Sequence, residues 1–432
     1  MENNRLILLD SFGQNFTSFK FYNEFLNVLY DYYHSVNYEN KPPILVFYEK
    51  FFIDPMVLPL LVGLGIYLKK HHGEPVDLLL MNNIKTVQLI HFLDNVDFFH
   101  IVGKNNNPCF PFGRDIFKFS NSALGGYYGL NKDVRKEHKL RYYSCEGDAV
   151  DNFLVKQVLD SGNPIDIKRD FLQEYFYDKI STDFSILFSD KYLLENQKGK
   201  MYFILSELVV NGIFHAKSDV CAMARTKSFV SERKNLINNK PIIRNTTFVA
   251  VSDVGIGFQQ SLQEKEIEED YPFEKFTITK ELEKKFGNKF SLDLYSIFDV
   301  LHYSVCKRRL GLIDLIIGCF IDPLTSKFHN LNYFRLHNNT AQIIFSSKHE
   351  KAIRVISQLR YKILKSFQIQ EKENITLLFI DAKKQILAFA NYLISEFFTN
   401  TQTASLRLFN VEFPGVHIEM DITEIKEEEE VL

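Results

Sequence analysis

Three polar residues in the segment "SELVVNGIFHA" (residues 206–216) recur at intervals of four: Glu207, Asn211 and His215. In a helix, positions four apart differ by only about 40° around the axis, so these side chains would form one polar stripe. The apolar residues between them would lie on another flank, suited to packing on a sheet. Such a stripe either lines a binding site or simply faces water, and the segment alone leaves both interpretations open.

A second segment, "FVAVSDVGIGF" (residues 248–258), ends a buried β-type run with an acidic residue and two glycines. Asp253 could accept a hydrogen bond from an exocyclic amine of a ligand at the end of the strand. Gly255 and Gly257 would let the backbone approach that ligand closely and adopt dihedral angles closed to other residues. The same pattern also describes a common exit from a strand into a turn.

Together, the two segments resemble the GHKL, or Bergerat-fold, ATPases (the HATPase_c domain). This class includes gyrase-type topoisomerases, histidine kinases, heat-shock chaperones, mismatch-repair proteins and, nearest in style, the anti-sigma-factor serine kinases. Their first motif, Glu-x-x-x-Asn followed by x-x-x-His-Ala, is matched by Glu207, Asn211, His215 and Ala216. Their second motif, Asp-x-Gly-x-Gly, is matched by Asp253, Gly255 and Gly257. Order and spacing both agree with the family.

The resemblance implies a role for each matched residue, with ATP and Mg²⁺ as cofactors. Asn211 would coordinate the magnesium ion that bridges the phosphates, and Asp253 would bind the adenine amino group. Glu207 matches the catalytic residue that activates the attacking water or hydroxyl in hydrolysing and kinase members. His215 would be structural.

The third motif of the family, Gly-x-Gly-Leu-Gly-Leu, is altered in this chain. The corresponding text is "CKRRLGLIDLI" (residues 306–316), in which Gly311 and Leu312 remain and Arg309 stands where an earlier glycine would be. Gly311 could open a helix whose N-terminus faces phosphate. The basic residues before it could supply positive charge to that phosphate or form a solvated turn. In the family this motif covers the phosphates, so the altered residues are expected to affect the geometry of the nucleotide lid and the rate of hydrolysis.

The N-terminal region resembles a STAS domain over residues 44–83. Strand-type and helix-type segments alternate there: 42–55, a helix over 57–73 ending at Gly73, a strand at 76–83, then another helix and strand within 84–102. This order predicts parallel strands covered by helices. STAS antagonists carry Asp-Ser-Ser at the first helix start, whereas this chain has Asp54-Pro55-Met56. Without a hydroxyl to phosphorylate, this domain is expected to be a docking surface.

The predicted fold is therefore α/β and multi-domain. It comprises a STAS-like domain (1–120), an irregular linker (121–165), a central Bergerat-fold α/β sandwich (166–348) and a small C-terminal α/β unit (349–432). A hairpin within 331–347 is expected to turn at Asn338-Asn339. In the C-terminal unit, strands at 374–382 and 405–413 would flank a helix at 384–398, weakly resembling a second STAS-like unit. The acidic end is read as a solvated tail.

Composition bounds the remaining possibilities. The chain has 432 residues, 46% hydrophobic and 24% charged, and a net charge of −3 that argues against a nucleic acid as direct ligand. Five cysteines without a CxxC pair predict reduced, structural thiols and no zinc site. The apolar window 55–68 is too short to span a bilayer and predicts a buried helix. No signal peptide is recognised, so a cytoplasmic protein without membrane contact is expected.

These points predict an ATP-binding regulatory switch that passes its nucleotide state to a protein partner. The matching reaction would be hydrolysis, in which ATP and water give ADP and phosphate. Two alternatives stay open: an anti-sigma-type protein serine kinase, and a non-catalytic interaction protein with a degenerate pocket. A homodimer is expected by analogy alone.

Overall fold

The structure is a computed structural model that describes most of the chain. The described residues are 5–9, 15–35, 38, 40–47, 52–80, 84–103, 114–119, 138–145, 150–185, 195–234, 241–265, 271–320, 333–369, 372–401 and 403–426. The chain divides into two compact units. The first unit comprises Met1–Thr226, Val249–Gly255 and Phe409–Pro414, and the second comprises Lys227–Phe248, Ile256–Leu408 and Gly415–Leu432. Each is described by itself.

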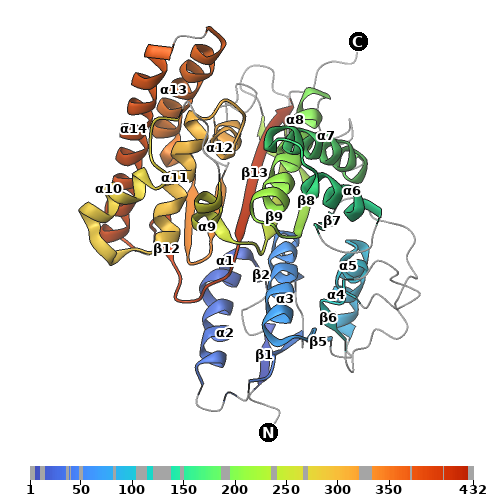
Figure 1. Cartoon of the computed structure of the whole chain (residues 1–432). Coiled ribbons are helices and arrows are strands. Elements are labelled where there is room, and N and C mark those ends of the chain that lie inside the picture. The colour runs from blue at the N-terminus through green and yellow to red at the C-terminus, as the bar shows by residue number, and fades with distance from the viewer. Residues whose placement is uncertain are drawn as a thin grey trace, which may run out of the picture. The chain divides into compact units, whose positions relative to one another are not determined.

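The first unit begins with the segments predicted to form a parallel sheet (Figure 1). Its strands and helices up to residue 102 are β1 (Leu6–Leu8), β2 (Asn15–Phe16), α1 (Ser18–Lys20), a π-helical turn (Phe21–Phe25), α2 (Leu26–Tyr33), β3 (Ile44–Phe47), β4 (Phe52–Ile53), a 3-10 turn (Pro55–Val57), α3 (Leu58–His72), β5 (Val76–Leu80), α4 (Ile84–Asn95) and α5 (Phe98–Val102). The later elements are β6 (Phe117–Lys118), β7 (His138–Tyr143), α6 (Val150–Asp160), α7 (Ile165–Asp183), α8 (Glu195–Val210) and a π-helical turn (Asn211–His215).

The predicted parallel strands are confirmed: the strand order is β1-β3-β5-β6, and each neighbouring pair is parallel. Residues Leu58–Gly65 of α3 are all buried, and the helix ends at Gly73 with a φ of 73°, as its sequence predicts. Asp54 caps the turn before α3 by accepting from the Met56 N–H at 3.1 Å, and Pro55 occupies the first helical position.

The prediction of a strand after the helix within 84–102 is wrong. This segment is helix α5, and the fourth strand of the sheet is β6. Phe98, Phe99, Ile101 and Val102 are all buried, and a short run of apolar residues does not distinguish a buried strand from a buried helix.

Two glycines of α3 mark close contacts within the first unit. A Cβ on Gly65 would lie 2.5 Å from the Ile116 side chain, next to β6. A Cβ on Gly63 would lie 2.8 Å from Ser252 Oγ and 3.3 Å from Val254 Cγ1. Helix α3 therefore packs directly against the residues on either side of Asp253.

Strands β8 (Val220–Lys234) and β9 (Pro241–Asp253) contribute residues to both units. In the first unit, β7 pairs antiparallel with the start of β8. The remaining elements are α9 (Gly257–Glu264), α10 (Thr277–Phe286), a 3-10 turn (Gly287–Lys289), α11 (Leu292–Cys306), α12 (Leu312–Phe320), β10 (Phe334–Asn338), β11 (Ala341–Phe345), a 3-10 turn (Ser347–His349), α13 (Glu350–Ile369), α14 (Lys372–Thr399), β12 (Leu406–Leu408) and β13 (Val416–Lys426).

The sheet of the second unit has the strand order β12-β11-β10-β13-β9-β8. The predicted hairpin is confirmed as β10 and β11, with its turn at Asn339 and Thr340, because Asn338 still pairs with Ala341. Helices pack on one face of this sheet: the Phe345 ring stacks on Phe389 of α14 with centroids 5.9 Å apart. Figure 1 shows α13 and α14 side by side as a long helical pair.

The strand expected at 374–382 is also wrong, since this segment lies in α14. The segment has a β-type composition, but its burial follows the period of a helix. Leu377 is 64% exposed, whereas the residues spaced three or four apart are buried: Ile375, Phe379, Ala382 and Ile386. The C-terminal region therefore lacks the expected strand–helix–strand order. The mixed, multi-domain α/β character is confirmed, whereas the STAS-like and Bergerat-fold assignments remain predictions. Among the described residues, no helix is both long and apolar enough to cross a membrane.

Asp299 of α11 holds the start of α10. Its carboxylate accepts from the N–H groups of Ile278 and Thr279 at 2.8 and 3.0 Å and from the Thr279 hydroxyl at 2.5 Å. Burial raises the pKa of Asp299 from 3.8 to about 6, against the opposing effect of these hydrogen bonds. Between pH 3.8 and about pH 6, the folded protein therefore binds more protons at Asp299 than the unfolded chain does.

We expect Asp299 to make the free energy of unfolding fall as the pH rises from about 4 to about 6, with no further contribution above that range. In Asp299→Asn, which keeps a hydrogen-bond acceptor but cannot ionise, this part of the pH dependence should vanish. Urea unfolding of both proteins from pH 4 to pH 7 measures it. If the difference in free energy of unfolding between the parent and Asp299→Asn does not change with pH, the Asp299 carboxyl has the same pKa in the folded and unfolded states.

Candidate functional site

Glu207 and Asn211 lie together at the end of α8, as their spacing predicts. The Asn211 amide donates to Glu207 Oε1 at 3.3 Å, and Glu207 is only 1% exposed. From Asn211 to His215 the helix widens into a π-helical turn, closed by the Ala216 N–H donating to the Asn211 carbonyl at 3.2 Å. Such turns occur frequently at functional sites. His215 ends this turn, its ring 5.1 Å from that of Phe214.

A buried arginine, which the sequence analysis missed, engages Glu207. The Arg169 guanidinium of α7 donates to Glu207 Oε1 at 2.5 Å, and Arg169 is 9% exposed. A sequence signal for it exists, because Arg169 is the charged member of the buried stripe that continues through Leu172, Phe176 and Ile180. Since Oε1 receives both Arg169 and Asn211, proton transfer to this carboxylate would have to use Oε2.

Asp253 lies against the end of α8, so the structure brings the first two motifs together. Asp253 is 7% exposed, and its Oδ1 accepts from the Gly255 N–H at 3.0 Å, which folds the turn after β9. A Cβ on Gly212 would lie 3.4 Å from Asp253 Cβ and 3.6 Å from Oδ2. The carboxylate therefore sits beside the residue that follows Asn211.

The two glycines of the second motif are required by packing within the chain. A Cβ on Gly255 would lie 2.3 Å from the Ala216 carbonyl oxygen, so only glycine allows the turn to approach the end of the π-helical segment. Gly257 has the predicted unusual dihedral, with a φ of 67°. In the second unit it lies against the β10–β11 hairpin, where a Cβ would come 2.6 Å from Asn339 Nδ2. Both close approaches are made to protein atoms.

The third motif lies in the second unit, and Gly311 does precede a helix, α12, which begins at Leu312. The N–H groups at this helix start already have acceptors within the chain. Gly311 donates to Asp314 Oδ2 at 2.8 Å, and Ile313 donates to Ser304 Oγ at 2.9 Å. A phosphate at this helix start would have to compete with both acceptors.

Arg360 of α13, also missed from the sequence, holds this turn in place. It is 2% exposed and donates to the carbonyls of Val305, Lys307 and Arg309. Its guanidinium also contacts both carboxylate oxygens of Asp314 at 3.1 Å.

The basic residues before Gly311 have contacts inside the second unit as well. The Arg308 guanidinium lies 5.1 Å from the centre of the Phe367 ring. The Lys307 side chain lies so close to Gly311 that a Cβ there would be 2.3 Å from Lys307 Cε. Lys307 and Arg308 therefore already contact other residues of the second unit. A phosphate at this turn would have to compete with these contacts.

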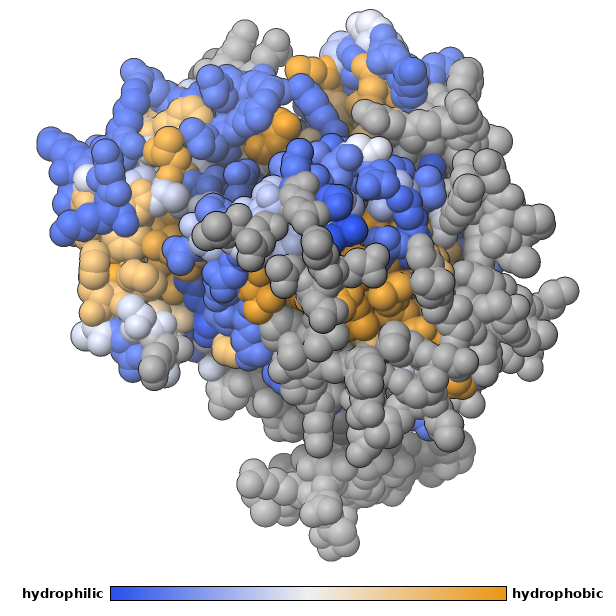
Figure 2. Space-filling view, turned by 90° about the horizontal axis from the view of Figure 1, so that it is seen from below, coloured by the Kyte–Doolittle hydropathy of each residue, from blue (hydrophilic) through white to orange (hydrophobic). Residues whose placement is uncertain are grey.

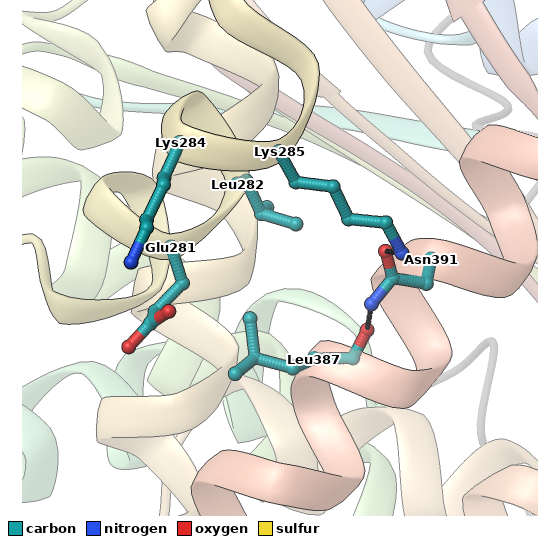
Figure 3. A pocket seen from close by; sticks show the side chains of 6 residues that line it. All are labelled: Glu281, Leu282, Lys284, Lys285, Leu387 and Asn391. Carbon is teal, nitrogen blue, oxygen red and sulfur yellow. Dashed lines mark hydrogen bonds between the residues drawn. The ribbon is translucent and has the colours of Figure 1, made fainter.

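A hollow of about 370 Å³ lies in the second unit, lined by Glu281, Leu282, Lys284, Lys285, Leu387 and Asn391 (Figure 3). None of these residues was predicted for the nucleotide site. Within the described ranges, no three or more His, Cys, Asp and Glu side chains are grouped to hold a metal ion. No disulfide bond joins the four described cysteines, Cys145, Cys221, Cys306 and Cys319, to one another.

No family model, no curated protein and no solved structure matches this chain.

Removing Arg169 should destabilise the fold strongly, because it leaves the Glu207 carboxylate buried without its cation. We expect Arg169→Ala to lower the free energy of unfolding by about 3–5 kcal/mol, whereas Arg169→Met combined with Glu207→Leu should restore most of it. The control is Arg354→Ala, since Arg354 pairs with Glu350 on an exposed surface and should contribute less than about 1 kcal/mol. Urea denaturation measures all three. Equal effects of the two single substitutions would mean that the Arg169–Glu207 pair is not energetically buried.

Proposed function

We propose that this protein binds an adenine nucleotide with Mg²⁺ at the end of α8 and the turn after β9, as a GHKL-type regulatory switch. The observation that carries the proposal is the packing of the Asp253–Gly255 turn on Gly212 and Ala216. This packing brings the two motifs, which are separated in sequence, next to each other, and that proximity supports the proposal.

Asp253 is the proposed adenine-binding group. Its Oδ1 is engaged by the Gly255 N–H, which fixes the orientation of the carboxylate, and Oδ2 faces the side of Gly212. A carboxylate oxygen accepts from the exocyclic amine of adenine, whereas guanine presents an acceptor at the same position. With guanine bound, the Asp253 carboxylate would face another hydrogen-bond acceptor, and leaving two buried acceptors without a donor is unfavourable. This arrangement favours ATP over GTP.

Asn211 is the proposed magnesium ligand. Its Nδ2 donates to Glu207, and this hydrogen bond assigns the other end of the amide, the carbonyl oxygen, to a different partner. Mg²⁺ prefers oxygen ligands and commonly takes only one or two from protein, with phosphate oxygens and water as the others. The ion would neutralise charge on the phosphates, and Asn211 would position it.

A nucleotide switch without turnover is the second candidate function. It is favoured by the Arg169–Glu207 pair, which occupies one oxygen of the proposed general base, and by the filled helix start at Gly311. Hydrolysis requires Glu207 to take a proton from water through Oε2. Transfer to a hydroxyl of a protein substrate, as in a serine kinase, would use the same carboxylate.

Asp253→Asn should weaken ATP binding by about ten- to a hundredfold, because it replaces one acceptor oxygen by a donor and can keep the turn through its remaining oxygen. Isothermal titration with ATP and GTP, with and without Mg²⁺, measures the effect. Asp160→Asn, at an exposed position of α6, is the matched control and should bind like the parent. Equal affinities of the parent protein for ATP and GTP would rule out adenine recognition by Asp253.

Glu207→Gln should keep ATP binding but lower any ATP turnover by a factor of about 100 or more, because the amide cannot act as a base. Asn211→Ala should instead remove the magnesium-dependent part of binding. Phosphate release and mass analysis of phosphorylated protein distinguish hydrolysis from transfer, with Glu174→Gln on the exposed side of α7 as control. Absence of both products in the parent, with ATP binding intact, would select the switch without turnover.

A further inference from the structure

Two leucines and four polar or charged residues line the hollow between α10 and α14 (Figure 3). Leu282 is fully buried and Leu387 is half-buried, while Lys284, Lys285, Glu281 and Asn391 complete the lining. Its volume of about 370 Å³ is at the small end of the range for ligand pockets. It has room for a few apolar side chains of a partner.

The walls of this groove are fixed by hydrogen bonds between the two helices. Lys383 of α14 donates to Glu281 of α10 at 3.0 Å, and Lys285 donates to Asn391 Oδ1 at 2.6 Å. The Asn391 amide in turn donates to the Leu387 carbonyl at 2.7 Å. These hydrogen bonds join α10 to α14 beside the groove.

Exposed apolar side chains also occur in the same unit, at the end of α14 and at the start of α11. Phe398 is 57% exposed and Leu292 is 43% exposed, and the Phe398 ring lies 5.5 Å from that of the buried Phe290. On the left side of Figure 2, where α10 and α14 lie in Figure 1, apolar residues lie beside hydrophilic ones. Exposed apolar surface rimmed by polar residues is typical of protein interaction sites.

The charge next to this surface is positive. Residues 277–289 contain four lysines, at 280, 284, 285 and 289, against Glu281 and Glu283, which gives a net charge of +2. Lys289 lies 6.0 Å from the centre of the Phe398 ring, so cations and apolar surface adjoin. The pKa of Glu281 is lowered, mainly by its hydrogen bond to Lys383 and also by Lys284. A complementary partner would carry carboxylates around an apolar side chain.

We propose that this groove binds a short acidic amphipathic helix of a partner protein. One apolar side chain of that helix enters the hollow between Leu282 and Leu387, and its carboxylates face Lys284, Lys285 and Lys289. The groove is lined by two helices and by no strand edge, so an extended peptide would find no main-chain ladder there. A hollow with room for a side chain also fits a helix better than it fits the flat surface of a membrane.

The experiment selects phage-displayed random peptides of about 16 residues, long enough for four helical turns, on the full chain without nucleotide. Selected peptides should place acidic residues around apolar residues three or four apart. Fluorescence anisotropy should show at least about tenfold weaker binding to Leu387→Glu, and to Lys284→Glu with Lys285→Glu. The lysine effect should shrink at high salt. Leu377→Glu, at a 64% exposed position of α14, and Lys362→Glu on α13 are controls that should change affinity by less than about twofold.

Binding that survives Leu387→Glu, or a selection that yields no peptide dependent on this groove, would overturn the proposal. Selected peptides without acidic residues would overturn the charge argument. Sedimentation with phosphatidylserine vesicles tests the other class of partner, and vesicle binding that is lost in the same variants would replace the helix by a membrane. Circular dichroism checks that each variant is folded. Because no nucleotide is used, the outcome is independent of the proposed nucleotide site.

Discussion

The steric contact between the turn after β9 and the end of α8 is the constraint on which the proposed site depends. Gly212, Ala216 and Gly255 are small because larger side chains would collide: a Cβ on Gly212 would lie 2.4 Å from Val220, and one on Gly255 would lie 2.3 Å from Ala216. The glycine pattern therefore has a packing cause that holds with or without a ligand. What points to a nucleotide is the pair of polar groups, Asp253 and Asn211, that this packing brings to one surface.

Two buried arginines hold groups that the proposed function would use. Arg169 binds Glu207 in the first unit, and Arg360 binds Asp314 and the turn before α12 in the second. Burying a charge costs free energy, so a buried ion pair is stable only when its geometry is good and its remaining polar atoms are hydrogen-bonded. A chemical step at Glu207 or a phosphate at Gly311 would have to exchange one of these contacts for another. In the structure, Glu207 Oε1 and the N–H groups of Gly311 and Ile313 are therefore engaged by groups of the chain itself.

Local sequence patterns predicted much of this fold, but they did not predict contacts between residues far apart in the sequence. Parallel strands, the end of α3 at Gly73 and the β10–β11 hairpin follow from residue types within a short window. The strands predicted within 84–102 and at 374–382 are wrong, because the composition of a short apolar run does not separate a strand from a buried helix. The partners of Glu207 and Asp314 lie 38 and 46 residues away, and tertiary packing selects them. A charged residue on an apolar helical stripe was their one available signal.

The position of Gly63 has a thermodynamic consequence for the first unit. Its contacts with Ser252 and Val254 place α3, a helix of the parallel sheet, directly behind the turn that carries Asp253. Because these side chains fill the space that a Cβ on Gly63 would need, α3 and the turn are closely packed, and packed interiors deform little. Free energy exchanged between two linked sites is reciprocal. If the Asp253 turn binds a nucleotide as proposed, a molecule that moved α3 would change the affinity for that nucleotide, and the nucleotide would change the affinity for the molecule by the same factor.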